Sequence, residues 1–92
     1  MHKTYLVETN RALFTFLVAE MQPGGPYNAT YVGTTRHTEQ SHVDGREWEK
    51  INLDGEAEGM DFNVLVAMCY REMTRRGGDI VDIKDISGDA RL

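Results

Sequence analysis

The sequence predicts an α+β domain: an antiparallel sheet of four to five strands with one long helix packed on it. Three observations support this prediction. Short segments rich in aromatic and β-branched residues recur, glycine and proline turn signals separate them, and one stretch near residues 61–76 has helical apolar spacing. With 92 residues, 40% of them hydrophobic, the chain is sized for a single domain, 1–92, with one modest core.

The first strands are predicted near the N-terminus. Residues 3–9 (KTYLVET) form a short aromatic and β-branched run that ends at Asn10. Residues 11–21 (RALFTFLVAEM) are apolar nearly all round, so their spacing fits a buried strand and a helix almost equally. We favour the strand, because Thr, Val and Phe suit a pleated surface and the Pro-Gly-Gly-Pro loop then leads directly into a strand over 28–36. A helix remains the alternative for 11–21.

Two further strands are predicted later in the chain. Residues 46–53 (REWEKINL) lie between two Asp-Gly pairs, at 44–45 and 54–55, which are strong signals for tight turns between antiparallel strands. The charged residues of this segment favour an edge or a half-exposed face. Residues 79–86 (DIVDIKDI) are expected to close the fold as the last strand.

The helix is predicted from Asp61 to Arg76. Asp61 is a good N-cap, Arg75 and Arg76 lie where the helix dipole favours cations, and Gly77 can adopt the left-handed conformation that ends a helix. At 100° per residue, one stripe of the helix is apolar and is expected to face the sheet. Its members are Phe62, Leu65, Val66, Cys69 and Met73.

The residue pattern argues against an enzyme, a metal site or a bound cofactor. Cys69 stands alone on the predicted helix, His2, His37 and His42 lack zinc-site spacing, and the aspartates at 79, 82 and 85 alternate between the faces of a strand. A thiol in the core stripe would be inert. Paired carboxylates such as Glu47 with Glu49 have no apolar neighbours that would separate their pKa values.

Composition also limits which partners and which cellular compartment are expected. Ten basic residues against fifteen acidic ones leave a net charge of −5, which disfavours binding to free duplex DNA. No apolar run approaches the roughly 20 residues that span a bilayer, so no membrane association is expected. With one cysteine and no recognisable leader, the expected compartment is a reducing bacterial cytoplasm.

Two surface features are candidates for partner binding. The first is an acidic stretch over residues 44–61, where seven acidic residues against Arg46 and Lys50 leave a charge equal to that of the whole chain. It could complement a basic surface, such as a groove that normally holds nucleic acid, or simply provide solubility. Its residues include Glu47, Glu49, Glu56 and Glu58.

The second candidate is the outer face of the predicted helix. Val64, Met68, Arg71 and Arg75 lie within about 60° of one another on the side opposite the core stripe, and apolar residues mixed with arginine are typical of protein interfaces. The alternative is that residues 11–21 form a helix that covers them. A weaker basic group, which includes Arg36 and His37, flanks a polar loop and could contact a phosphate or an acidic surface.

In these features the chain resembles the small phage-encoded anti-CRISPR proteins, in particular those directed at the type I-F RNA-guided surveillance complex. The resemblance is one of size and character, carried by the acidic stretch and the outer helix face, and it rests on no diagnostic motif. It implies a non-enzymatic inhibitor that binds Cas protein subunits of the complex, with the guide RNA as a further candidate contact, and blocks recognition of target DNA.

Two other classes of protein stay open. An assembly or structural subunit of a phage particle would also expose an apolar face and carry no chemistry. A small transcriptional regulator is the weaker alternative, because it would normally have a helix-turn-helix and a basic recognition face. The sequence leaves the identity of the partner, the strand order and the oligomeric state undetermined.

Overall fold

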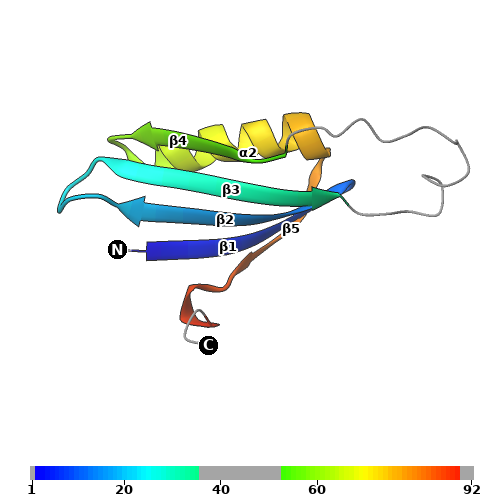
Figure 1. Ribbon diagram of the computed structural model, residues 1–92, viewed down its shortest axis with the longest axis horizontal. Helices are drawn as coiled ribbons and strands as arrows, with labels where there is room; N and C mark the ends of the chain where they lie inside the picture. The colour runs from blue at the N-terminus through cyan, green and yellow to red at the C-terminus, as the bar shows by residue number, and fades with distance from the viewer. Residues whose placement is uncertain (1, 36–52, 90–92) are drawn as a thin grey trace, which may run out of the picture.

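The computed structural model describes residues 2–35 and 53–89, and it confirms the predicted fold class: an antiparallel sheet of five strands with one helix packed on it (Figure 1). The elements follow one another as β1 (His2–Thr9), β2 (Ala12–Glu20), β3 (Tyr27–Thr35), β4 (Gly55–Gly59), the helix α2 (Phe62–Gly77), β5 (Ile80–Asp85) and a short 3₁₀ turn, Ser87–Asp89. The strands lie in the order β4-β3-β2-β1-β5, so β4 and β5 form the two edges.

Residues 11–21 form a strand rather than the alternative helix. Strand β2 lies between β1 and β3, and in its centre Phe16 pairs with Tyr5 on one side and with Tyr31 on the other. The turn from β2 to β3 contains Gly24 and Gly25 with φ of 86° and 104°, backbone angles that side chains disfavour. The Pro-Gly-Gly-Pro sequence therefore makes the predicted hairpin.

The edge strand next to β3 was not predicted. Strand β4, with the sequence GEAEG, pairs antiparallel with β3, and Gly55 is its first residue rather than part of a turn. Glycine and glutamate have low strand propensity, so no local pattern predicts a strand at these residues. The predicted strand 46–53 lies, apart from the buried Leu53, outside the described residues.

The helix forms nearly as predicted, with one correction at its end. The Asp61 side chain accepts a hydrogen bond of 3.0 Å from the Val64 amide and so acts as the N-cap. Gly77 does not adopt the left-handed conformation that was predicted for it. It is the last helical residue, and Gly78 takes the positive φ of 91°. A side chain at Gly77 would lie 2.8 Å from Phe14, so close contact rather than chain reversal accounts for this glycine.

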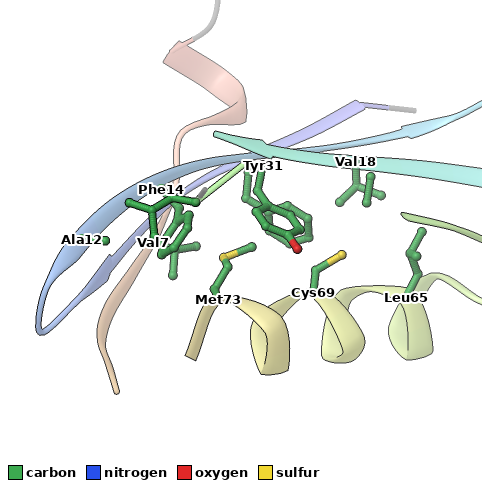
Figure 2. Packing of buried hydrophobic residues seen from close by; sticks show 11 residues of the cluster. Val7, Ala12, Phe14, Val18, Tyr31, Leu65, Cys69 and Met73 are labelled. Atoms are coloured by element: carbon green, nitrogen blue, oxygen red, sulfur yellow. The ribbon is translucent and has the colours of Figure 1, made fainter. Parts of the chain in front are cut away.

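The core lies between α2 and one face of the sheet (Figure 2). Because side chains alternate along a strand, Phe14, Phe16 and Val18 of β2 point to the helix while Thr15 and Leu17 point to the opposite face. From the helix, the predicted stripe supplies Leu65, Cys69 and Met73 as buried residues, and Phe62 and Val66 pack against them half-buried. Tyr70 also joins the core, in edge-to-face contact with Phe16.

A buried hydroxyl fixes the end of the helix to the sheet. Thr9, at the end of β1, is fully buried and donates to the Gly77 carbonyl at 2.6 Å while it accepts from the Ala12 amide at 3.0 Å. The Arg11 amide donates to the same Gly77 carbonyl at 3.0 Å, and the Asn10 amide donates to the Asp79 carbonyl at 3.0 Å. The β1–β2 turn is thereby bonded to the last turn of α2.

We predict that Thr9→Val, which keeps the shape of the side chain and removes the hydroxyl, lowers the free energy of unfolding by about 1 to 3 kcal/mol, because the buried Ala12 amide loses this acceptor. Urea denaturation followed by circular dichroism measures the change. Thr34→Val is the matched control, since Thr34 is exposed and its 3.5 Å hydrogen bond is long. Equal unfolding midpoints for the two variants would contradict a role for Thr9 in stability.

Candidate binding surface

The outer face of α2 is exposed as the helical spacing predicted. Val64 and Met68 keep 56% and 54% of their surface accessible, and Arg71 and Arg75 are also exposed. Because residues 11–21 are the central strand β2, they do not cover this face. The helix therefore presents two large apolar side chains and two arginines on one exposed surface, which we call the helix face.

The arginines near the end of α2 differ in their surroundings. Arg75 donates a hydrogen bond of 2.7 Å to Glu72, and Arg76 approaches the same carboxylate at 3.5 Å. The hydrogen bond from Arg75, together with the positive charges nearby, lowers the pKa of Glu72. Among the described residues, neither a hydrogen bond nor a salt bridge holds the Arg71 guanidinium. Arg71 is thus the helix-face cation best placed to pair with a partner.

A groove of about 340 Å³ lies between α2 and the edge strand β4, next to the helix face. The helix contributes one wall, β4 the other, and β3 contributes the Tyr31 side chain. Arg76 crosses one end, where its guanidinium lies 5.9 Å from the centre of the Tyr31 ring and donates to the Asp54 carbonyl at 2.8 Å. The lining residues are Tyr31, Glu56, Ala57, Met68, Cys69, Arg71, Glu72 and Arg76.

Tyr31 reaches this groove because its cross-strand neighbour on β4 has no side chain. Gly55 pairs directly with Tyr31, and a Cβ on Gly55 would overlap the phenol ring. The ring also packs edge-to-face on Phe14 and Phe16, which anchors it to the core. Burial raises the pKa of Tyr31, so the hydroxyl stays neutral at physiological pH.

Cys69 forms the inner wall of the groove and is not a reactive nucleophile. Its side chain points from α2 toward the sheet (Figure 2), and only 1% of the residue is exposed. Burial, with a smaller contribution from Glu72, raises the pKa of the thiol to about 11. The thiolate, which is the reactive form, is therefore scarce at neutral pH.

Part of the acidic stretch lies on β4, where the register directs the side chains of Glu56 and Glu58 to the sheet face away from α2. Glu56 and Glu58 are exposed on β4, and Glu56 lines the groove together with Met68 and Arg71. The other candidates, Glu47, Glu49, Arg36 and His37, lie outside the described residues. Tyr31, Ala57 and Arg76 were not predicted as parts of this site, because they come together through the pairing of β3 with β4 and not through a local pattern.

In the part of the chain that the structure describes, no three His, Cys, Asp or Glu side chains are grouped so as to hold a metal ion. The helix in that part falls short of the length and apolar character needed to cross a membrane. No protein-family model, no curated protein and no solved structure matches the chain.

We predict that a thiol-specific reagent modifies Cys69 in the native protein at pH 8 at least 100-fold more slowly than in the unfolded chain, because a pKa near 11 instead of 9.0 lowers the thiolate fraction roughly 100-fold. The native rate should rise about tenfold per pH unit up to pH 10. Absorbance of the released chromophore measures both rates, with guanidinium-unfolded protein as the control. Rapid modification of the native protein would show that the thiol is accessible.

Proposed function

We propose that the chain is a non-enzymatic inhibitor that binds a bacterial CRISPR-Cas RNA-guided surveillance complex and blocks recognition of target DNA. The observation that carries the proposal is the exposed helix face, in which Val64 and Met68 lie beside Arg71 and Arg75. Among the described residues the core is built from the opposite side of α2, so Val64, Met68 and Arg71 are not part of it, and Arg75 contributes only an exposed bond to Glu72. Their character suits contact with another macromolecule.

The helix face has the properties of a protein-binding surface. Large apolar side chains and arginine supply most of the energy in protein interfaces, because they bury much area and make several hydrogen bonds at once. Arg75 is held by Glu72 at 2.7 Å before any partner arrives, so less side-chain freedom is lost when it binds. These contacts favour a Cas protein subunit as the principal partner.

The acidic residues of the edge strand β4 support the choice of a nucleic-acid-handling complex. Proteins that hold guide RNA or target DNA line their channels with Lys and Arg, because these neutralise phosphate groups. Glu56 and Glu58 are exposed on β4 and could pair with such basic side chains. Occupation of the channel by carboxylates would compete with the phosphates of target DNA. Contact with the guide RNA would then be limited to the arginines.

One observation favours an alternative function, that of an assembly subunit. The face of the sheet opposite α2 exposes apolar residues, with Leu17 at 40% and Val32 at 57%. Apolar residues on an uncovered sheet are also found where subunits pack together. A small phage structural protein that assembles through this face would use the helix face less. The oligomeric state of the purified chain separates the two functions.

We predict that the purified chain blocks target-DNA binding by a type I-F surveillance complex at a near-stoichiometric ratio and without turnover. Electrophoretic mobility shift of labelled target DNA, titrated with the chain, measures the inhibition.

Arg71→Ala combined with Arg75→Ala should weaken binding to the complex by roughly 2 to 4 kcal/mol, because arginines at the centre of an interface supply much of its energy. Surface plasmon resonance should show this as faster dissociation.

Two controls keep the inhibition experiment decisive. Asp79→Ala with Asp82→Ala changes exposed residues at the other edge of the sheet and should leave the inhibition unchanged. Circular dichroism confirms that each variant is folded. Catalytic release of a product, or direct binding of the chain alone to duplex DNA at physiological salt, would contradict the proposal.

A further inference from the structure

We propose that β4 binds an extended segment of the partner as an added strand, and that this segment carries basic side chains at alternate positions. The inference deepens the proposed function, on which it rests for the claim that the chain binds a protein. It concerns how the partner is recognised. Four features of β4 support it: its edge position in the described sheet, its small residues, the groove beside it and its two carboxylates.

Among the described residues, no strand pairs with the outer edge of β4. Strand β4 pairs with β3 alone among the described strands, and Figure 1 shows it as the outermost strand on that side of the sheet. Every second residue of an edge strand directs its N–H and C=O groups away from the sheet. An extended peptide can bond to those groups, which is a common mode of peptide recognition.

The two edges of the sheet differ in how they resist such pairing. Strand β5 carries Lys84 between Asp82 and Asp85, and the β1–β5 ladder shifts register between Glu8 and Thr9. Charged side chains, lysine in particular, and an irregular ladder are features that hinder an edge strand from pairing with another chain. Strand β4 pairs with β3 in unbroken register from one end to the other. Its residues that face α2 are small: Gly55, Ala57 and Gly59.

The groove offers room for the side chains of an added strand. A strand placed beside β4 would direct alternate side chains toward α2, where the groove is lined by Met68, Cys69 and the Tyr31 ring. These three side chains are apolar or neutral, and the charged residues Arg71, Glu72 and Arg76 of α2 also line the groove. Apolar side chains such as Val fit this side of the added strand. Its other side chains would project to the opposite face of the sheet.

The charges on that opposite face select the occupant. Glu56 and Glu58 pair with Thr30 and Asn28, so their side chains lie on the face away from α2. In an antiparallel pair of two β4 strands, centred on Ala57, Glu56 of one copy would lie directly opposite Glu58 of the other, and like charges in that position are destabilising. Lysine or arginine at the same positions would be stabilising. A second copy is therefore disfavoured and a basic strand is favoured.

The test uses the peptide acetyl-Val-Lys-Val-Lys-Val-amide and the intact ¹⁵N-labelled chain. We expect the largest chemical-shift changes in residues 55–59 and in the part of α2 that lines the groove, with slower amide exchange in β4. The variant Glu56→Lys with Glu58→Lys should weaken binding about tenfold and should favour the corresponding Val-Glu-Val-Glu-Val peptide, because both cross-strand charge pairs are reversed. Asp79→Lys with Asp82→Lys, which changes net charge equally at the other edge, should bind the lysine peptide as the unmodified chain does.

Strand pairing is tested separately from charge with two N-methylated peptides. Methylation of the two lysine amides and methylation of the two outer valine amides block opposite edges of the peptide, so one peptide should bind and the other should not. Equal binding of both, or shift changes confined to Val64 and the helix face, would overturn strand addition. If the chain inhibits the surveillance complex but fails to bind the peptide, strand addition is wrong and the proposed function stands. If the chain binds the peptide but does not inhibit the surveillance complex, strand addition is supported and the proposed function is wrong.

Discussion

The bond between the Thr9 hydroxyl and the Gly77 carbonyl sets the position of α2, and the binding surface depends on that position. Thr9 lies at the end of β1 and Gly77 at the end of the helix, 68 residues later, so this 2.6 Å contact joins distant parts of the chain. With its C-terminal turn held there, α2 turns Leu65, Cys69 and Met73 toward the sheet. The same rotation leaves Val64, Met68 and Arg71 outside.

The groove is a consequence of how the core is packed. Phe14 and Phe16 hold the Tyr31 ring from below, and the missing side chain of Gly55 lets that ring extend beneath β4. Arg76 then packs over the ring at 5.9 Å and bonds to the Asp54 carbonyl, just before β4 begins. The spacing between β4 and α2 is thus set by the Tyr31 ring, Gly55 and Arg76, and not by the helix-face side chains that we expect to bind a partner.

How far the sequence predicts this structure depends on whether a feature is local. The strand preference of residues 11–21, the Asp61 cap and the core stripe are local, and each is confirmed. Strand β4 was missed because its stability comes from pairing with β3, which compensates for poor intrinsic propensity. The groove was missed because β4 was not predicted and because β3, which supplies Tyr31, is distant in sequence from β4 and α2. The exposure of the helix face was predicted because its four residues lie on one side of a single helix.

The two parts of the proposed surface need each other. A five-residue strand is about 17 Å long, and the area it covers is well below the roughly 800 Å² that each partner buries in a stable complex. The helix face adds area, but by itself it has few groups that fix the orientation of a partner. Arg71 and Met68 belong to both the groove and the helix face. A partner strand paired to β4 would therefore bring the flanking part of the partner directly onto Val64 and Arg75, so that backbone pairing supplies the alignment and the helix supplies most of the buried area.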